Sequence, residues 1–340
     1  MRIDFRSDTV TRPTPPMLEA MMQAWVGDDV FGEDPSINEL ERVSAEMFGM
    51  EAALYCPSGT MTNQIAIKCH TQPGDEVICD QTAHIYQYEG GGIAFNSGAS
   101  VKLLNGNRGR IEASQVLESI NPDDVHKART SLVCLENTSN RGGGSCYELE
   151  SITAIRKVCD DHQLPLHLDG ARLFNALVAK NQKATDYGQL FHSISFCLSK
   201  SLGAPVGSVL LGNSGFIKKA RRVRKAFGGG MRQAGFLAAA GIYALKHHIE
   251  RLEEDHWHAR LLADVLQEKD FVSEVLPVET NIIIFHLHPR LKSTELVAAL
   301  KEKEILAYAI APHSVRLVVH LDITSKMIDR TIEVIQQLKF

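Results

Sequence analysis

The segment Ser193–Gly212 reads SISFCLSKSLGAPVGSVLLG, and two short apolar runs in it flank a turn rich in glycine and proline. In the first run large apolar residues alternate with small ones, which is the pattern of a β-strand. Glycines and a proline then interrupt the chain before the second run begins. Lys200 therefore lies near a strand end, where α/β proteins carry reactive groups. A lysine can equally be a solvated surface charge, so its role depends on the rest of the chain.

Similar apolar runs recur upstream and alternate with helical patterns. Together with the two runs around Lys200 they read ALYC, EVICD, SVKLL, SLVCLEN, LPLHLD, SISFCLS and GSVLLG. Strands separated by helices predict an α/β fold with a mostly parallel central sheet covered by helices. Two helices are expected ahead of these strands, over residues 17–25 and 37–47, the second with Ser36 as its N-cap.

The end of the chain has a different pattern. Residues 234–266 read as a long helical stretch, and two strands and two helices follow it. A chain of 340 residues is also longer than one compact core usually grows. We therefore expect an N-terminal arm and a large α/β domain over residues 1–245. A linking helix and a small α+β domain should occupy residues 246–340.

Charge and hydropathy exclude several classes of partner. There are 36 basic and 41 acidic residues, for a net charge of −5, and 44% of residues are hydrophobic. The basic run KKARRVRK, Lys218–Lys225, is more typical of a solvated helix face than of a nucleic-acid site. No apolar run is long enough to span a bilayer, and the N-terminus MRIDFRSDTVTRP lacks the apolar segment of a secretory signal. We expect no nucleic-acid or membrane partner.

The cysteines and histidines show no metal pattern. The seven cysteines form no CxxC pair and lie mostly in apolar segments, so we expect reduced, buried thiols in a cytoplasmic protein. Two histidine pairs, at 256 and 258 and at 286 and 288, lack the cysteine or HExxH partners of a zinc site. No metal is expected.

Two further motifs change the interpretation of Lys200. In LPLHLDGAR, Asp169 ends an apolar strand, and in YCPSGTMTNQIAI, Ser58, Gly59 and Thr60 stand between a strand and a helix. Separately, the aspartate could be a helix cap and the Ser-Gly-Thr turn any helix start. In this order, a phosphate-binding helix start, a carboxylate for a ring nitrogen and a lysine amine are the groups that pyridoxal 5′-phosphate requires.

The motifs together resemble a known family. They are RSDTVTRPT, DDVFGEDPS, SGTMTNQIA, DQTAHIYQYEGGG, LENT, HLDGAR, SKSLGAPVGSVLLG and FGGGMRQAGFLAAAGIYAL. In this order they resemble the low-specificity L-threonine aldolases, fold-type I pyridoxal phosphate enzymes of the β-eliminating lyase and threonine aldolase family. The resemblance runs from Ile3 to the C-terminal helix. It implies reversible cleavage of L-threonine, L-allo-threonine and related β-hydroxy-α-amino acids to glycine and an aldehyde, which is acetaldehyde for threonine.

The resemblance also implies cofactor-binding residues. Lys200 would form the Schiff base with pyridoxal 5′-phosphate, and Asp169 would pair with the pyridine nitrogen. Arg172 would reach the phenolic oxygen of the ring and the substrate carboxylate. The phosphate would be bound by Ser58, Gly59 and Thr60. Arg232 would add to that site from a neighbouring subunit of a homotetramer built from dimers with shared sites.

The substrate would be held and deprotonated by further residues. His84 would stack on the ring and assist removal of the β-hydroxyl proton, which suits a group whose pKa lies near neutrality. Ser7 and Arg316 would hold the amino-acid carboxylate, since arginine binds such anions in bidentate fashion. Because Arg316 comes from the small domain, the site is expected between the domains.

Two positions depart from the family pattern. Ser139 follows LENT where the family has a histidine that contacts the substrate hydroxyl, and Phe31 stands where a tyrosine is expected. These departures leave open the preference between threonine and allo-threonine and the identity of the base. They also leave open an aldolase for a bulkier aryl substrate, a β-eliminating lyase of the tyrosine phenol-lyase or tryptophanase kind, and a non-catalytic protein that binds pyridoxal phosphate.

Overall fold

The seven runs predicted as strands assemble into one sheet in the computed structural model, which describes residues 2–340. The strand order is β2-β8-β7-β6-β5-β3-β4. β8 runs antiparallel to β2 and β7, and every other neighbouring pair in this sheet is parallel, so the predicted α/β fold is confirmed. The strands are β2 (Ala52–Cys56), β3 (Glu76–Asp80), β4 (Ser100–Leu104), β5 (Thr130–Glu136), β6 (Leu166–Gly170), β7 (Ser193–Cys197) and β8 (Ser208–Gly212).

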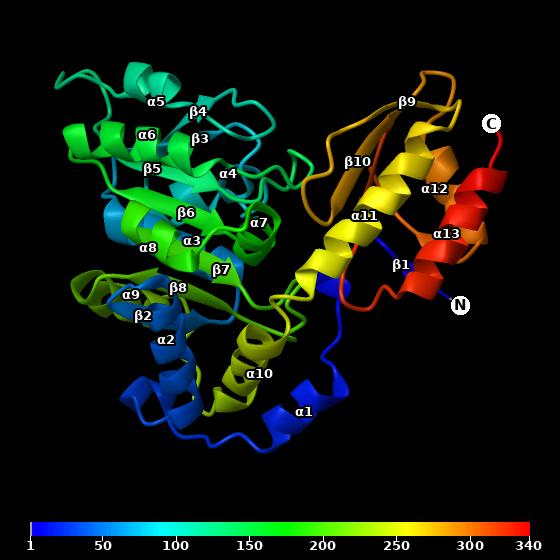
Figure 1. Ribbon diagram of the computed structural model, residues 1–340. Coiled ribbons are helices and arrows are strands. Elements are labelled where there is room, and N and C mark those ends of the chain that lie inside the picture. The colour runs from blue at the N-terminus through cyan, green and yellow to red at the C-terminus, as the bar shows by residue number, and fades with distance from the viewer. Residues whose placement is uncertain (1) are drawn as a thin grey trace.

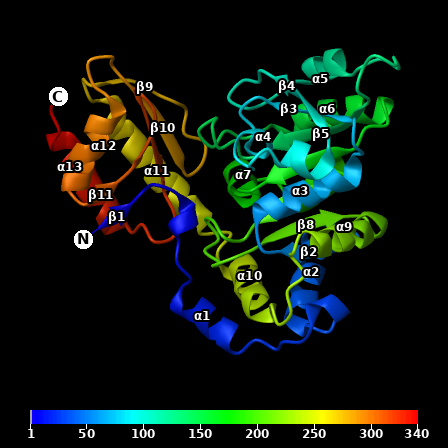
Figure 2. The same cartoon turned by 180° about the vertical axis from the view of Figure 1, so that it is seen from behind.

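Helices cover both faces of this sheet. Figure 1 shows α6, α7 and α8 in front of it, and the view from behind in Figure 2 shows α3 on the opposite face. Strands β5 to β8 are buried along their whole length, which is why they read as continuous apolar runs. The helices and helical turns of this region are η1 (Asp8–Val10), α1 (Pro15–Met22), η2 (Asp29–Phe31), α2 (Pro35–Phe48), α3 (Gly59–His70), α4 (His84–Gln87), η3 (Ile93–Ser97), α5 (Ala113–Ser119), α6 (Leu149–Asp161), α7 (Leu173–Lys180), α8 (Ala184–Leu190), α9 (Ser214–Ala226) and α10 (Gly235–His247).

The start of α2 differs from the prediction. Asp34, not Ser36, is the N-cap, and its Oδ1 accepts the backbone N–H of Ile37 at 3.0 Å. Pro35 is well suited to the first helical position, because it has no N–H to satisfy and its φ is already helical. The helix therefore begins one residue before Ser36, whose hydroxyl donates to the carbonyl of Trp25 at 2.7 Å instead.

A second hydrophobic core lies in the C-terminal region, shown in orange and red in Figure 1. It is built on a four-stranded antiparallel sheet in the order β12-β13-β10-β9. The elements here are α11 (Leu252–Gln267), β9 (Val272–Val275), β10 (Ile282–Leu287), α12 (Ser293–Glu302), β11 (Ile305–Leu306), β12 (Tyr308–Ala311), β13 (Ser314–Val318) and α13 (Ser325–Gln337).

The N-terminal arm packs with this second core. Its first strand, β1 (Ile3–Asp4), pairs in parallel with β11, and the side chains of Ile3 and Phe5 are buried in the C-terminal core. The first described strand, β1, and the C-terminal helix, α13, therefore both belong to the small domain, as Figure 1 shows.

The predicted linking helix is interrupted, because α10 ends at His247 and α11 begins at Leu252.

Two other predictions concern the cysteines and membrane-spanning helices. All seven cysteines are buried and free, as predicted. Among the helices of residues 2–340, none combines the length and the apolar character that a bilayer crossing requires.

Candidate active site

Lys200 follows β7 by three residues and is partly buried. Within residues 2–340 its side-chain amine makes no hydrogen bond and no ion pair, although it is close enough to influence the pKa values of Asp8 and His84. The position after a strand is the predicted one, and an amine without a partner remains available for reaction.

Asp169 lies at the same edge of the sheet, near the end of β6, and is 2% exposed. Its Oδ1 accepts the backbone N–H of Ala171 at 3.2 Å. Its Oδ2 is buried and has no hydrogen-bond partner in the described part of the chain. A buried carboxylate oxygen is costly to leave unpaired, so this atom indicates a donor supplied by a ligand.

Glu136 stands directly beside Asp169 in the register of β5 and β6. Its two oxygens accept the backbone N–H groups of His84 and Asn140, both at 2.8 Å. Burial and the Asp169 carboxylate raise the pKa of Glu136 to about 7, against the opposing effect of these two hydrogen bonds. Glu136 thus joins two loops of the site through their backbone.

His84 opens α4 and faces two carboxylates. Its Nδ1 lies 3.1 Å from Oε1 of the buried Glu89, and the side chains of His84, Glu89 and Asp169 offer polar atoms within 4.8 Å of one another. Burial alone would lower the pKa of His84. The hydrogen bond to Glu89 and the negative charge of Asp169 have the larger, opposite effect, so the pKa of His84 is raised. The imidazole is therefore held close to the carboxyl group of Asp169.

The predicted phosphate-binding residues lie at the start of α3. Ser58 is the N-cap, and its hydroxyl accepts the N–H of Met61 at 3.2 Å. The N–H groups of Gly59 and Thr60 have no acceptor among residues 2–340, so they are free for an anion at the positive end of the helix dipole. A Cβ on Gly59 would come within 2.7 Å of the Cys197 sulfur, which explains why the helix start can approach the end of β7 only with glycine here.

Arg172 is buried and bound to the N-terminal segment. Its Nε and Nη2 donate to the two oxygens of Asp8 at 2.6 and 2.7 Å, and Ser201, next to Lys200, donates to the same carboxylate at 2.8 Å. Burial opposes ionisation of Asp8, but Arg172 outweighs it and holds the pKa of that carboxyl well below its usual range. The remaining guanidinium nitrogen, Nη1, makes no hydrogen bond within residues 2–340.

Arg316 reaches the site from β13 of the small domain. Its Nη1 donates to Asn140 at 2.9 Å, its Nη2 donates to the carbonyl of Arg6 at 3.1 Å, and its Nε is buried without a partner. Burial and the nearby charges of Arg172 and Arg141 lower the pKa of Arg316 to about 10. A pair of arginines that repel each other favours an anion between them.

Ser7 lies between the residues that bind these two arginines, since Arg6 binds Arg316 and Asp8 binds Arg172. Its hydroxyl accepts the backbone N–H of Thr9 at 3.2 Å and is also bonded to the Thr9 hydroxyl at 2.9 Å. Ser7 is thus held by its two sequence neighbours close to the segment that contacts both arginines, and its role at the substrate carboxylate stays a prediction.

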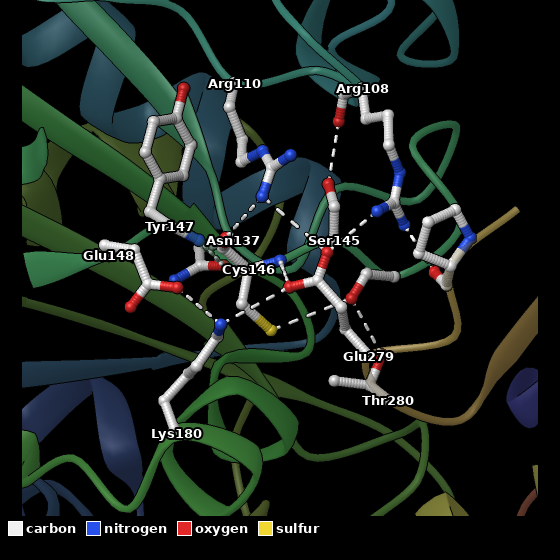
Figure 3. A network of polar contacts seen from close by, with 12 residues as sticks. Arg108, Arg110, Asn137, Ser145, Cys146, Tyr147, Glu148, Lys180, Glu279 and Thr280 are labelled. Atoms are coloured by element: carbon white, nitrogen blue, oxygen red, sulfur yellow. Dashed lines mark hydrogen bonds and ion pairs between the residues drawn. The ribbon is translucent and has the colours of Figure 1, made fainter. Parts of the chain in front are cut away.

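A network of hydrogen bonds and ion pairs around Glu279 and Thr280, here called the seam, joins the small domain to the large one (Figure 3). Glu279, in the connection between β9 and β10, accepts from Arg108 at 2.9 Å and from the backbone N–H of Cys146 at 3.2 Å, and it lies 3.6 Å from Lys180. Thr280 donates to the carbonyl of Gly144 at 2.9 Å. The seam thus anchors the sheet that carries Arg316.

Three predicted positions form no hydrogen bond with the side chains described above in residues 2–340. Arg232 is exposed and pairs with Asp28 at 2.8 Å, so its predicted role depends on a neighbouring subunit. Ser139 is buried, and its hydroxyl accepts the N–H of Gly142 at 3.2 Å, while the next residue, Asn140, is the one bonded to Arg316. Phe31 is 72% exposed.

Three carboxylates of the site were not singled out from the sequence: Asp8, Glu89 and Glu136. Each stands inside a motif already quoted, RSDT, HIYQYEGGG or LENT. An acidic residue inside each motif was the available signal, but the partners of these residues lie mostly in distant parts of the chain. No pattern of consecutive residues in the sequence predicts these partners.

The residues present fit pyridoxal 5′-phosphate. The fit rests on the buried unpaired Oδ2 of Asp169, the amine of Lys200 and the free N–H groups of Gly59 and Thr60. These are an acceptor for a ring nitrogen, a nucleophile for an aldehyde and donors for a phosphate.

Comparisons with known proteins give one consistent result. The family model described as "Beta-eliminating lyase" matches residues 4–289. The low specificity L-threonine aldolase of Escherichia coli (strain K12) is 43% identical over 327 residues, covering 96% of each chain. Low-specificity L-threonine aldolase 1 of Arabidopsis thaliana is 41% identical over 342 residues, covering 98% of this chain and 96% of that one. The solved structure of Leishmania major threonine aldolase superposes with a TM-score of 0.87 at 22% identity, covering 98% of this chain and 99% of that one.

Proposed function

The chain belongs to the beta-eliminating lyase family, and from that premise we propose that it cleaves L-threonine, L-allo-threonine and related L-β-hydroxy-α-amino acids to glycine and an aldehyde. The curated relatives at 41–43% identity are named for this activity. The observation that carries the proposal is the buried, unpaired oxygen of Asp169 at the same sheet edge as the unpaired amine of Lys200.

The cofactor is pyridoxal 5′-phosphate, whose ring, when bound, takes up the electrons left at Cα as the Cα–Cβ bond breaks. Lys200 provides the amine through which this group is held. Asp169 would accept a hydrogen bond from the ring nitrogen through Oδ2 and so keep that nitrogen protonated. The N–H groups of Gly59 and Thr60, together with the hydroxyl groups of Ser58 and Thr60, bind the phosphate at the start of α3.

Arg316, Arg172 and Ser7 bind and orient the substrate carboxylate. The free Nη1 of Arg172 and the unpaired Nε of Arg316 are the donors that the chain leaves available. Fixing the carboxylate fixes the rotation about the substrate's Cα. The scissile bond can then be held perpendicular to the cofactor ring, the orientation in which its electrons enter the ring.

His84 accepts the proton of the β-hydroxyl group through Nε2. Its Nδ1 is directed to Glu89, so the other ring nitrogen carries the lone pair. Loss of that proton turns the hydroxyl carbon into the carbonyl carbon of the leaving aldehyde. A proton delivered to Cα then completes glycine.

Oligomeric state, location and the domain boundary are further parts of the proposal. We propose a homotetramer in which Arg232 serves the phosphate site of a neighbouring subunit. It is supported by exposed apolar side chains near the N-terminus, among them Trp25, 80% exposed, and Phe31, 72% exposed. The seven free cysteines favour a reducing compartment such as the cytoplasm. We place the division between the domains at residues 245 and 246.

The test is a product assay on the purified protein supplied with pyridoxal 5′-phosphate. L-threonine, L-allo-threonine and L-phenylserine are incubated in parallel, and glycine, the matching aldehyde, ammonia and keto acids are measured. Glycine with an equal amount of aldehyde is the expected result. Ammonia and a keto acid would instead assign an eliminating lyase, and bound cofactor without any product would assign a non-catalytic protein.

A further inference from the structure

We propose that Glu89 is a positioning residue that fixes the tautomer of His84, and that a buried chain of hydrogen bonds ending at His70 fixes the partner of Glu89 in turn. This inference rests on the proposed function, because it concerns the base that receives the β-hydroxyl proton. It adds residues that lie outside the group around Lys200.

Glu89 accepts three hydrogen bonds in a buried position. His84 Nδ1 lies 3.1 Å and the Asn63 amide nitrogen 2.9 Å from Oε1, and the Gln64 amide nitrogen lies 2.7 Å from Oε2. The two amide donors come from α3, the helix whose first turn forms the phosphate site. Because a carboxylate can only accept here, the proton of the neutral imidazole must be on Nδ1 of His84.

The orientation of Asn63 is set from the other side. Its Oδ1 lies 3.2 Å from Nε2 of His167, and Nδ1 of His167 lies 2.9 Å from the hydroxyl of Ser193. That hydroxyl lies 2.9 Å from Nε2 of His70. The chain therefore runs from His84 through Glu89, Asn63, His167 and Ser193 to His70, with α3 contributing both Asn63 and His70.

Only one assignment of protons satisfies every contact along this chain. The Asn63 oxygen is an acceptor, so His167 must donate through Nε2 and accept from Ser193 at Nδ1. Ser193 has a single hydroxyl proton, so His70 must donate to its oxygen. Flipping the Asn63 amide would place an oxygen against the Glu89 carboxylate and a donor against the Nε2–H of His167.

The low pKa values of His167 and His70 keep this proton assignment unchanged over the working pH range. Burial lowers the pKa of His167 to about 4 and that of His70 to about 3. Both rings are therefore neutral above pH 5, as the proton assignment requires. Asp169 partly opposes this effect at His167, whereas His167, His192 and Lys219 add to it at His70.

The charged groups that face His84 are Glu89, Asp169, Glu136 and Lys200. Glu89 differs from the others in bonding to a ring nitrogen, so it controls both the pKa and the tautomer. Removing its charge should lower the pKa of His84, and removing its fixed acceptor should let the ring adopt the Nε2–H tautomer, which cannot act as a base at Nε2.

The experiment compares the wild type with Glu89→Gln. In the cofactor-free protein with ¹³C- and ¹⁵N-labelled histidine, the His84 resonance, identified by its loss in His84→Asn, is titrated by NMR. We expect a lower His84 pKa in Glu89→Gln and an Nδ1–H tautomer in the wild type. In the loaded enzyme we expect kcat to fall by about 10- to 100-fold with little change in KM, and the acid limb of the kcat–pH profile to move to lower pH.

Glu118→Gln is the matched control, since it makes the same change on the exposed side of α5 and should alter none of these quantities. An unchanged His84 pKa in Glu89→Gln would overturn the proposal. If that variant does not fold, the wild-type spectrum decides, because an Nε2–H tautomer above the titration range contradicts the assignment. The NMR titration does not require an active enzyme. An inactive wild type would therefore reject the proposed function, whereas the His84 pKa and tautomer would still decide whether Glu89 positions His84.

Discussion

At the scale of single residues, the site is marked by polar atoms that the chain leaves without partners. The Asp169 oxygen and the Arg316 Nε are buried and unpaired, and the Lys200 amine lacks any recorded bond within residues 2–340. Elsewhere in a folded protein such atoms are usually paired, because an unpaired buried polar group costs about 1–3 kcal/mol. The Asp169 oxygen lies near the end of β6 and the Lys200 amine follows the neighbouring strand β7, which is the structural reason to expect a ligand with a ring nitrogen and an aldehyde there.

Lys200→Ala should abolish turnover, because no other amine in the described site can replace it. The variant should also fail to gain the mass of pyridoxal phosphate after borohydride treatment, which mass spectrometry of the polypeptide measures. Lys326→Ala, an exposed lysine on α13, is the control and should retain both properties. A Lys200→Ala protein with wild-type turnover would remove the basis of the cofactor assignment.

Glu136 should make the stability of the cofactor-free protein depend on pH. Its pKa is raised to about 7 in the folded state from a usual 4.5, so between these values the folded protein holds a proton that the unfolded chain has released. The free energy of unfolding should therefore fall as the pH rises through this window, by at most about 1.4 kcal/mol per pH unit. Thermal unfolding from pH 4.5 to 8 measures the slope.

The comparison for this prediction is Glu136→Gln, which cannot titrate. Its absolute stability should be lower, because an amide cannot accept both N–H groups that Glu136 binds, those of His84 and Asn140. Its slope between pH 4.5 and 7 should nevertheless be flatter than that of the wild type. Equal slopes would assign the proton uptake to another group.

At the scale of elements, the start of α3 depends on close contact with the end of β7. In Gly59→Ala the new Cβ would lie 2.7 Å from the Cys197 sulfur, so the helix start must move away from the sheet. We expect a loss of stability of about 1–3 kcal/mol and weaker binding of pyridoxal phosphate, measured by thermal unfolding and by cofactor titration.

Gly215→Ala is the matched control, because it makes the same substitution in the first turn of α9. There the nearest atom to a new Cβ is an Asn213 oxygen at 3.5 Å, which is an ordinary contact. Alanine is the better helix former, so stability should stay equal or rise by up to about 1 kcal/mol. Equal behaviour of the two variants would show that the contact with Cys197 is not restrictive.

The turn after β5 is a second element with a testable role. Ser139 is buried against Gly109, and Asn140 of the same turn binds Arg316. Ser139→His cannot place an imidazole in the space of a serine, so the turn and Asn140 should shift. We expect a changed ratio of kcat/KM for L-threonine and L-allo-threonine. An unchanged ratio would mean that selection between the two substrates occurs elsewhere.

At the scale of the whole molecule, the site depends on how two cores are held together. Arg316 belongs to the core of the small domain, whereas Lys200 and Asp169 belong to the large sheet. The seam through Glu279 and Thr280 joins the two, and Asn281 continues it by donating to Ser201, next to Lys200, at 3.2 Å. The position of Arg316 relative to Lys200 and Asp169 therefore depends on contacts outside the site.

Glu279→Gln should raise the KM for threonine by about 3- to 10-fold with a smaller effect on kcat. The change removes a charge that faces Arg108, Arg110 and Lys180, and hydrogen bonds to charged groups contribute about 1.5–3 kcal/mol. Steady-state kinetics measure the effect. Glu274→Gln on the exposed side of β9 is the control, and an equal KM in the two variants would contradict a positioning role for the seam.

The sequence by itself determined the α/β class, all seven strands of the large sheet and the positions of Lys200, Asp169 and the Ser58–Thr60 turn at strand ends. These features are local, because strand periodicity, glycine turns and helix starts are each determined by consecutive residues. Only the tertiary structure decided that the N-terminal arm joins the C-terminal core, that Asp34 caps α2, and that Asp8, Glu89 and Glu136 are part of the site. Each of these depends on partners supplied by the fold: the sheet register sets Glu136 beside Asp169, and α3 brings Asn63 and Gln64 to Glu89. A buried carboxylate acquires its role from the donors around it, and those donors come together only when the chain folds.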